Sequence, residues 1–380
     1  MKIVIAPDSF KGSASAGQVA EALARGWRKV FPNALVMTLP MADGGEGTTE
    51  ALVAATGGTT ETVAVQDPLG RPLEASFGIL GDGQTAVVEV AAASGLPLLS
   101  AAERNPLLTT TYGTGQLIRA AMRKGISRLL IGLGGSATVD GGAGLVSALG
   151  AKLLNAAGRP IGPGGGSLGE LAQIQPGELP RLVGKVEILA ACDVDNPLTG
   201  PNGAAAVFGP QKGAAPDEVS RLDRNLAHYA KLIARDLGVQ VDRLAGAGAA
   251  GGLGAGLVAF LGAKLVPGIE MVMAASELEE KLQNCDLVIT GEGKLDGQSA
   301  RGKTPVGVAR LAAKARIPVL AIGGAIAQDA DELYEQGIGA MLSITPGPIS
   351  LETAMEQGEK LLEETAQRAA RLFALSGWRD

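Results

Sequence analysis

The chain has 380 residues, of which 46% are hydrophobic and 19% charged, a composition typical of folded globular proteins rather than disordered ones. At about 150 residues per domain, this length predicts two or three domains. Lysine and arginine total 33 against 39 acidic residues, and a net charge of −6 argues against a broad electrostatic surface for nucleic acid or anionic lipid. Two distant cysteines argue against a zinc cluster or a disulfide scaffold, and the single histidine excludes a mechanism that needs two imidazoles.

Neither candidate membrane segment has the pattern that such a segment requires. The apolar run at the N-terminus stops at Asp8, which predicts a strand and not a signal peptide. Residues 245–263 carry no charge, but seven of these 19 are glycine, which favours a glycine-rich loop entering a buried helix over a membrane span. We therefore expect a cytoplasmic protein with no membrane partner and no nucleic-acid partner.

Strands and helices alternate along the first sixty residues, as they do in a parallel α/β sheet. Strands are predicted at 2–5 and 34–39. The helix between them starts at a capping box formed by Ser15 and Gln18.

The middle of the chain is less regular. Three β-rich segments, 62–65, 75–80 and 85–90, predict an antiparallel set with a turn at 67–70. The elements that follow are a helix at 114–124, a strand at 128–133, a helix at 140–154, a strand at 186–192 and a helix at 216–237. The last hundred residues resume strict alternation, with strands at 286–290, 319–322 and 340–344, a helix at 306–315 and a long helix at 350–373.

This order of elements predicts an α/β protein with two domains. The first is a Rossmann-like, doubly wound parallel-sheet domain that is discontinuous in sequence and takes residues 1–60, 107–140 and 275–380. The second is an inserted, mixed α/β domain that takes residues 61–106 and 141–274. Open parallel sheets bind ligands at the carboxyl ends of their strands, so site residues are expected directly after strands.

The segment after strand 286–290 predicts phosphate binding. Residues 297–304 fit the P-loop pattern GxxxxGK[ST], but six residues separate this strand from Gly297, whereas a P-loop strand leads directly into the first glycine. A P-loop NTPase therefore stays as an alternative, and we expect a phosphate-facing loop of another kind. Its candidate binding residues are Gly291, Gly293, Lys294 and Lys303.

A second glycine-rich segment follows strand 128–133. Gly134, Gly135 and Ser136 fit the GxGxx[GA] pattern, yet no strand ending in an acidic ribose ligand comes about 20 residues later. The pattern therefore favours a phosphate loop over a nicotinamide site. Tight packing of helix on sheet, with Asp140 as helix cap, is the alternative.

Acidic residues also follow predicted strands. Asp193 and Asp195 come after strand 186–192, where carboxylates can hold Mg²⁺ or accept a proton from a hydroxyl, although an Asx turn would explain them too. Asp8 comes after the first strand in the same way, with Ser9 and Lys11 beside it. Asp43 fits a helix cap together with Glu46, so its spacing alone does not predict a site.

Six motifs, in the same order and spread over essentially the whole chain, make this sequence similar to bacterial type I glycerate kinases. They are IAPDSFKGSASA at 5–16, ADGGEGT at 42–48, DPLGRP at 67–72, RNPLLTTTYGTG at 104–115, CDVDNPL at 192–198 and TGEGKLDGQSARGK at 290–303. The resemblance implies ATP-dependent phosphorylation of D-glycerate, typically at the 2-hydroxyl to give 2-phosphoglycerate. It also implies a discontinuous Rossmann-like domain with an inserted domain.

We therefore predict a cytoplasmic glycerate kinase that uses ATP and Mg²⁺, has D-glycerate as its small-molecule partner and is a monomer or homodimer. Phosphoryl transfer needs positioning and charge neutralisation more than a covalent group, which suits a site without histidine. The alternatives left open are a P-loop NTPase and a non-catalytic module that binds a small organic anion. Taken together with the resemblance, the candidate residues are Asp193, Lys11 and Asp296 for catalysis, Asp8, Ser9, Asp43 and Arg71 for the substrate, and Asp195 and Glu292 for the metal. Either Arg71 or Lys11 is predicted to hold the glycerate carboxylate.

Overall fold

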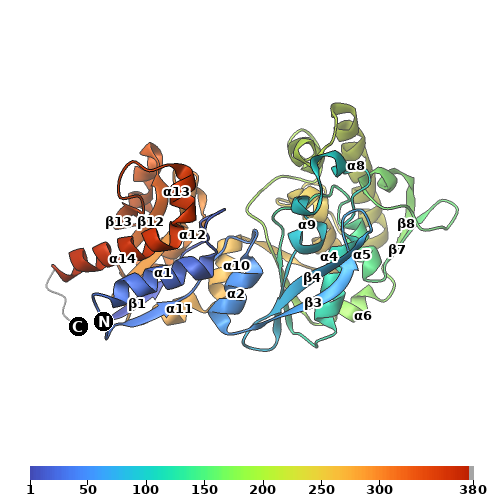
Figure 1. Ribbon diagram of the computed structural model, residues 1–380. Helices are drawn as coiled ribbons and strands as arrows, with labels where there is room; N and C mark the ends of the chain where they lie inside the picture. The colour runs from blue at the N-terminus through green and yellow to red at the C-terminus, as the bar shows by residue number, and fades with distance from the viewer. Residues whose placement is uncertain (376–380) are drawn as a thin grey trace. The chain divides into compact units, whose positions relative to one another are not determined.

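The computed structural model describes residues 1–375, which form two compact units, each with a central sheet covered by helices (Figure 1). Unit 1 consists of Met1–Asp43, Glu50–Gly57 and the chain from Ile269 onward. Unit 2 consists of Gly44–Thr49 and Gly58–Gly268. The predicted class is confirmed: a doubly wound α/β unit that is discontinuous in sequence, with a second, mixed α/β unit inserted in it.

Unit 1 is built on a five-stranded sheet in the order β13-β12-β11-β1-β2, in which every neighbouring pair is parallel. Its strands are β1 (Lys2–Ile5), β2 (Leu35–Thr38), β11 (Leu287–Leu295), β12 (Val319–Ile326) and β13 (Ala340–Ser343). Its helices are α1 (Ala16–Arg28), α2 (Thr48–Thr56), α10 (Gly268–Ala275), α11 (Leu278–Lys281), α12 (Thr304–Lys314), α13 (Leu351–Glu356) and α14 (Gly358–Ala374), with 3₁₀ turns η5 (Ser299–Arg301) and η6 (Gln328–Gln336). Crossovers through helices on both faces give the sheet its doubly wound order.

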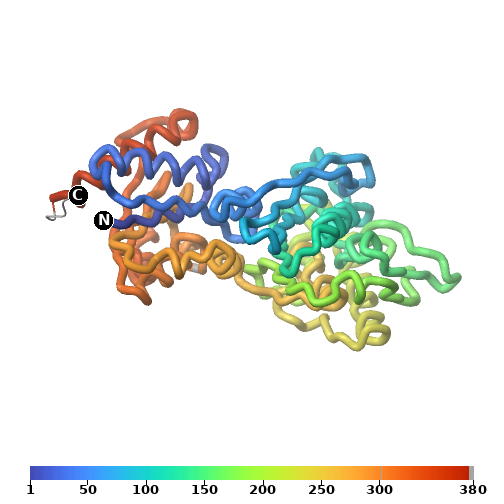
Figure 2. The backbone as a smooth tube through the Cα atoms, turned by 90° about the horizontal axis from the view of Figure 1, so that it is seen from below, coloured from blue at the N-terminus to red at the C-terminus, as the bar shows by residue number. Residues whose placement is uncertain are grey.

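Helices α1 and α14 pack against each other, so an N-terminal and a C-terminal segment of the chain lie together in unit 1. The predicted capping box at Ser15 starts α1, whose apolar face packs in one core cluster with α14. Gly26 allows this packing, because a Cβ at that position would lie 2.1 Å from the carbonyl oxygen of Glu363. In Figure 2 the blue N-terminal and red C-terminal parts of the chain accordingly lie side by side.

Unit 2 is built on a six-stranded sheet in the order β10-β9-β6-β5-β4-β3. Its first four strands are parallel, whereas β4 pairs antiparallel with β5 and with β3. The strands are β3 (Thr59–Gln66), β4 (Pro72–Ile79), β5 (Thr85–Glu89), β6 (Arg128–Gly132), β9 (Glu187–Ala191) and β10 (Lys264–Val266), with a separate hairpin of β7 (Lys152–Asn155) and β8 (Leu171–Gln175). The helices are α3 (Ala91–Ser94), α4 (Tyr112–Met122), α5 (Ala143–Ala148), α6 (Leu179–Val183), α7 (Ala204–Phe208), α8 (Pro216–Leu237) and α9 (Ala249–Leu261), with 3₁₀ turns η1 (Leu96–Leu98), η2 (Ala101–Glu103), η3 (Gly165–Glu170) and η4 (Pro210–Lys212).

The structure corrects the predicted assignment of residues 107–140 to the first domain. These residues belong to unit 2, because β6 pairs with β5 on one side and β9 on the other, in the six-stranded sheet. The alternation of strands and helices predicts a parallel neighbour for β6. Which of the two sheets the strand joins is decided by long-range contacts, and the local sequence pattern carries no information about them.

Three predicted elements also differ from the structure. The capping box at Asp43 and Glu46 is absent, since α2 begins at Thr48. The predicted helix at 140–154 is the short α5 followed by β7, and the predicted helix at 350–373 is divided between α13 and α14.

The glycine-rich segment at 245–263 forms the buried helix α9, as predicted. Its first turn has left-handed backbone at Ala250, Gly251 and Gly252, where glycine is favoured. Within residues 1–375, no helix is long and apolar enough to cross a membrane.

Candidate functional site

In unit 1, Asp8 and Ser9 come directly after β1, at the carboxyl end of the sheet. The Asp8 carboxylate accepts the backbone N–H of Ser9 and the hydroxyl of Thr304, both at 2.6 Å. Thr304 is fully buried and is the first residue of α12. Burial raises the pKa of Asp8, and although the Thr304 hydrogen bond opposes this, the charge of Asp43 raises the pKa further.

Glu292 lies close to this aspartate in the same unit. Its carboxylate accepts the hydroxyl of Ser299 and lies 3.7 Å from the ammonium group of Lys303. Burial raises the pKa of Glu292, the Ser299 hydrogen bond and the Lys303 charge lower it, and the charges of Asp8 and Asp296 raise it again. Asp8, Asp43, Glu292 and Asp296 therefore form an acidic cluster, in which burial and neighbouring negative charge raise the pKa values of Asp8 and Glu292.

The acidic cluster does not form a complete metal site by itself. Within the described part of the chain, no three aspartate, glutamate, histidine or cysteine side chains are arranged to hold a metal ion. Mg²⁺ is usually bound through one or two carboxylates, with phosphate oxygens and water as its other ligands. The cluster therefore fits a Mg²⁺ that arrives with a phosphate ligand.

The sequence predicts that strand 286–290 ends before a loop at 291–294, but these residues form part of the strand. β11 runs on to Leu295, and Lys294 pairs with Ala325 of β12. Gly291 permits this close pairing, since a Cβ there would lie 2.1 Å from the carbonyl oxygen of Ile322. Glycines are rare inside strands, which is why the sequence predicts a loop.

The loop that does follow β11 is residues 296–303. Only Asp296 separates the strand from Gly297, so the six-residue gap that argued against a P-loop does not exist. The backbone N–H groups of Gln298 and Ser299 donate to the Asp296 carboxylate at 3.0 and 3.3 Å. Because a P-loop presents its backbone N–H groups to phosphate, this internal use of two of them differs from P-loop geometry.

Lysines of unit 1 lie beside the acidic residues. The ammonium group of Lys294 is 3.1 Å from Asp296. Burial raises the pKa of Asp296, but hydrogen bonds from Lys294 and from the backbone outweigh it, and the pKa lies below its ordinary value. Lys11 is exposed, and no ion pair joins it to another residue in the described range.

In unit 2, the candidate residues follow the carboxyl ends of β6 and β9. Asp193 is exposed, and its carboxylate accepts the backbone N–H of Gly268 at 2.9 Å. Asp195, two residues further, is exposed as well. Gly134 comes after β6 and lies against the 44–47 segment, since a Cβ there would be 2.8 Å from the Cα of Gly45.

Glu89 is a candidate that sequence reasoning missed. It is the last residue of β5 and accepts the backbone N–H groups of Thr49 at 2.7 Å and Gly47 at 3.2 Å. Burial raises its pKa despite these hydrogen bonds. A single acid that ends the apolar run TAVVE was the available signal, because it places a carboxylate at the carboxyl end of a buried strand.

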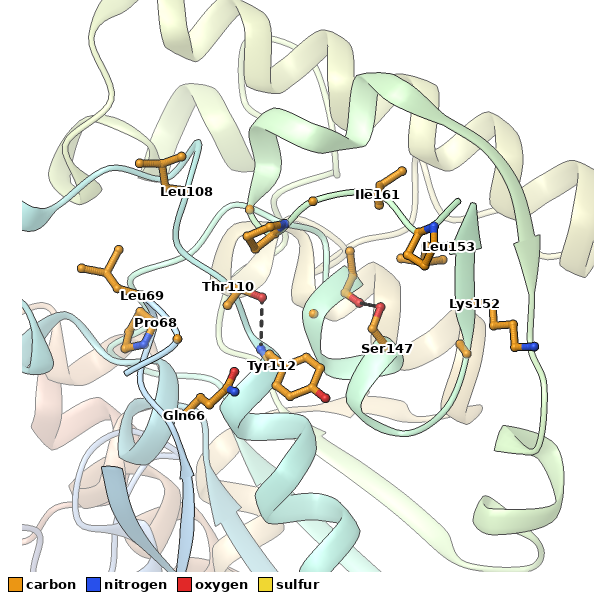
Figure 3. Close-up of a pocket in the computed structure, with 18 residues that line it drawn as sticks. Gln66, Pro68, Leu69, Leu108, Thr110, Tyr112, Ser147, Lys152, Leu153 and Ile161 are labelled. Atoms are coloured by element: carbon orange, nitrogen blue, oxygen red, sulfur yellow. Dashed lines mark hydrogen bonds between the residues drawn. The ribbon is translucent and has the colours of Figure 1, made fainter. Parts of the chain in front are cut away.

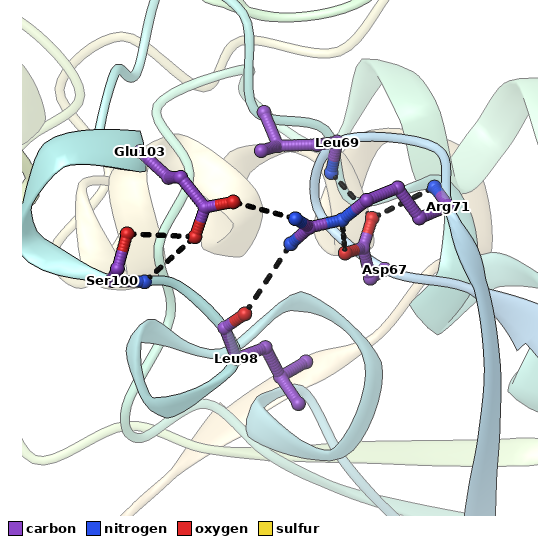
Figure 4. Close-up of polar contacts among 6 residues, drawn as sticks. All are labelled: Asp67, Leu69, Arg71, Leu98, Ser100 and Glu103. Carbon is purple, nitrogen blue, oxygen red and sulfur yellow. Dashed lines mark hydrogen bonds and ion pairs between the residues drawn. The ribbon is translucent and has the colours of Figure 1, made fainter.

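Arg71 has carboxylate partners within unit 2, as Figure 4 shows. Its guanidinium group pairs with Asp67 and, at 2.6 Å, with Glu103, and it contacts the carbonyl oxygen of Leu98 at 3.5 Å. Hydrogen bonds from the backbone and hydroxyl of Ser100 and from Arg71 lower the pKa of Glu103 to about 2. These contacts join the 67–71 turn to the segment 98–103, and they occupy several of the donors that a substrate carboxylate would need.

Glu103→Gln is expected to lower the melting temperature at pH 7. A depressed carboxyl pKa contributes stability above the unfolded-state value of about 4.5, and that contribution is lost as the pH falls toward 2. The difference in melting temperature between variant and wild type should therefore shrink between pH 5 and pH 3. Thermal unfolding of both proteins between pH 5 and pH 3 measures this difference, and Glu170→Gln, at an exposed position, is the control. A difference in melting temperature that does not change with pH would contradict the prediction.

A pocket of about 620 Å³ also lies in unit 2. Figure 3 shows Leu69, Leu108 and Ile161 among its apolar walls, with Thr110 and Tyr112 as polar groups. Its volume is that of a small-molecule site. However, no predicted site residue lines it.

Comparisons with known proteins agree with the resemblance seen in the sequence motifs. The family model described as "Glycerate kinase family" matches residues 3–374. A glycerate kinase of Bacillus subtilis (strain 168) is 52% identical over 376 residues, covering 99% of this chain and 98% of the relative. A glycerate 2-kinase of Escherichia coli (strain K12) is 53% identical over 355 residues, covering 93% of each chain. A crystal structure from Salmonella typhimurium LT2, provisionally named glycerate kinase 2, superposes with a TM-score of 0.92 at 49% identity and covers 99% of both chains.

Proposed function

Because this chain belongs to the glycerate kinase family, we propose that it transfers the γ-phosphoryl group of ATP to the 2-hydroxyl of D-glycerate, giving 2-phosphoglycerate. The observation that carries this proposal is the identity of about half of all residues, over nearly the full length, to named glycerate kinases that include a glycerate 2-kinase. The enzyme is a phosphotransferase with an alcohol group as acceptor. We further propose that it is a cytoplasmic monomer or homodimer.

Mg²⁺ is the proposed metal, and the acidic cluster supports it. Asp8 and Glu292 both have raised pKa values, mainly because of burial. Neighbouring negative charge raises them further, from Asp43 for Asp8 and from Asp8 and Asp296 for Glu292. A divalent cation would relieve that repulsion. Glu292, with Asp8 near it, would hold the ion in unit 1, and Asp195 stays a candidate ligand from the sequence. Bound there, Mg²⁺ would neutralise charge on the transferring phosphoryl group.

The remaining candidates have separate proposed roles. Asp193 accepts the proton of the substrate hydroxyl, with Asp296 as the alternative carboxylate. Substrate contacts are proposed for Asp8, Ser9, Asp43, Lys11 and Arg71. Phosphate contacts are proposed for Lys294, Lys303 and the glycines Gly134, Gly135, Gly291 and Gly293, together with Ser136.

Phosphorus NMR of the product tests the proposal directly. Incubation with ATP, Mg²⁺ and D-glycerate should give the resonance of 2-phosphoglycerate, and the 3-phosphate would correct the acceptor position. Two controls separate the alternatives. ATP hydrolysis that does not depend on glycerate would indicate an NTPase, whereas glycerate binding without ATP turnover would indicate a binding module.

Lys303→Met should raise KM for ATP about 10- to 100-fold and leave KM for glycerate within about threefold. Lys303 directly precedes α12 and pairs with Glu292, so its ammonium group is well placed for a charge-assisted bond to phosphate, which is worth about 1.5–3 kcal/mol. Initial rates measured against each substrate check this. Lys314→Met, in the exposed last turn of the same helix, is the control. An unchanged KM for ATP would exclude Lys303 from phosphate binding.

A further inference from the structure

Unit 2 contains a lysine that is almost completely buried. Lys212, the last residue of η4, is only 2% exposed. Its ammonium group donates to the hydroxyl of Ser136 at 2.7 Å and to the carbonyl oxygen of Thr138 at 2.8 Å. Lysine is almost never fully buried without a specific partner. Both partners belong to one segment, the glycine-rich loop that follows β6.

A second set of hydrogen bonds fixes the loop that Lys212 contacts. Residues 94–96 form backbone hydrogen bonds with it, from Leu96 N–H to the Gly135 carbonyl and from Ala137 N–H to the Ser94 carbonyl, both 2.8 Å long. Gly135 has a φ of +73°, a conformation that favours glycine. Lys212 thus contacts two buried residues, Ser136 and Thr138, that directly follow the turn at Gly134 and Gly135, of which Gly135 is exposed.

A buried acid, Asp140, follows the same loop in the sequence. Asp140 is 1% exposed and accepts backbone N–H groups of Thr111, Gly142 and Gly144 at 2.9–3.1 Å. Its negative charge acts on Lys212 and favours the ammonium form. The hydroxyl of Thr138, which is also buried, has no hydrogen-bond partner among residues 1–375, so one polar group of this loop is unpaired.

We propose that Lys212 is a positioning residue that orients the Gly134–Ser136 turn, through the Ser136 hydroxyl, to bind a phosphoryl group of the nucleotide. The role rests on the proposed function. An ammonium group that donates to the Ser136 oxygen leaves the hydroxyl hydrogen free to donate to an anion. The buried positive charge adds electrostatic attraction in surroundings where water screens it little.

The surroundings of Lys212 predict a pH signature. Burial lowers its pKa to about 7, although Asp140 opposes the shift. Among the described residues, Asp140 is the charged side chain that acts on the ammonium group of Lys212. Arg104 approaches the neighbouring Gly213 only with its backbone carbonyl oxygen. A bound phosphate would raise the lysine pKa, so nucleotide binding above pH 7 should take up a proton. Affinity should therefore fall on the order of tenfold from pH 6.5 to 8.5.

The experiment is calorimetric titration of the full-length protein with ATP and Mg²⁺ at several pH values, in buffers of different ionisation enthalpy. Lys212→Met should weaken ATP binding at pH 6.5 at least tenfold, abolish the proton uptake and flatten the pH dependence. KM for glycerate should change less than threefold. Lys281→Met is the matched control, because that ammonium group also donates to a backbone carbonyl, at 2.7 Å, but belongs to unit 1.

A second variant keeps the proposal testable if Lys212→Met does not fold. Ser136→Ala should weaken ATP binding severalfold, and in the double variant the two losses should not add. Wild-type ATP affinity and proton uptake in either folded variant would overturn the proposal. A wild-type protein that binds ATP with this pH dependence but does not phosphorylate glycerate would instead contradict the proposed function and support the role of Lys212.

Discussion

Replacing Asp193 with asparagine should lower kcat about 10²- to 10⁴-fold, the usual contribution of a general base. With a single histidine in the chain, His228, which contacts the carbonyl oxygen of Leu171, the base must be sought among carboxylates and lysines. Asp193 directly follows β9, where open α/β sheets bind ligands. Asparagine cannot take the proton, yet its side-chain oxygen can still accept the N–H of Gly268. Steady-state kinetics and the far-ultraviolet circular dichroism spectrum of the variant measure activity and fold separately.

Asp82→Asn is the matched control for this substitution. Asp82 also accepts backbone N–H groups, those of Gln84 and Thr85 at 2.9 Å, but it precedes β5, at the opposite end of the parallel strands. Its kcat should stay close to wild type. A folded Asp193→Asn protein with kcat within about threefold of wild type would remove Asp193 from the mechanism and move the role to Asp296 or Asp43. Part of any loss reflects orientation, because a loose transition state needs little help from a base.

Lys11→Ala is expected to raise KM for glycerate about 30- to 900-fold, which corresponds to about 2–4 kcal/mol for a charge-assisted contact to the substrate carboxylate. Lys11 is exposed next to the residues that follow β1, and it has no ion-pair partner within residues 1–375. Arg71, the other predicted carboxylate ligand, is already paired with Asp67 and Glu103. We therefore expect Arg71→Ala to change KM less and to lower the melting temperature more.

The measurement for this pair is KM for glycerate at saturating ATP, together with the melting temperature of each variant. Lys360→Ala, an exposed lysine of α14 that pairs with Glu364 at 4.0 Å, controls for loss of surface charge. An unchanged KM in both Lys11→Ala and Arg71→Ala would rule out both as carboxylate ligands. A large KM increase in Arg71→Ala alone would mean that its pairs with Asp67 and Glu103 open when substrate binds.

Local pattern was sufficient for much of the fold. The helix at 216–237 has both predicted ends, because Pro216 starts it and Gly238 ends it in a left-handed conformation. The capping box at Ser15 and strand β1 also lie where they are predicted. Capping residues and hydrophobic periods act within a few positions of themselves, so their effects can be read without tertiary contacts. Strand β11 shows the limit, since its glycines favour a loop unless neighbouring strands are present to pack against them.

By itself, the sequence determined the α/β class, the discontinuous first domain and, through six ordered motifs, the family, which the comparisons confirm. Only the tertiary structure decided that residues 107–140 join the second sheet, that Arg71 pairs with Asp67 and Glu103, and that Lys212 contacts Ser136. The physical reason is the range of the interactions. Lys212 and Ser136 are 76 positions apart, and neither periodicity nor capping carries information over that distance. Which strands pair, which charged residues form ion pairs and which side chains are buried depend on the packing of the whole chain.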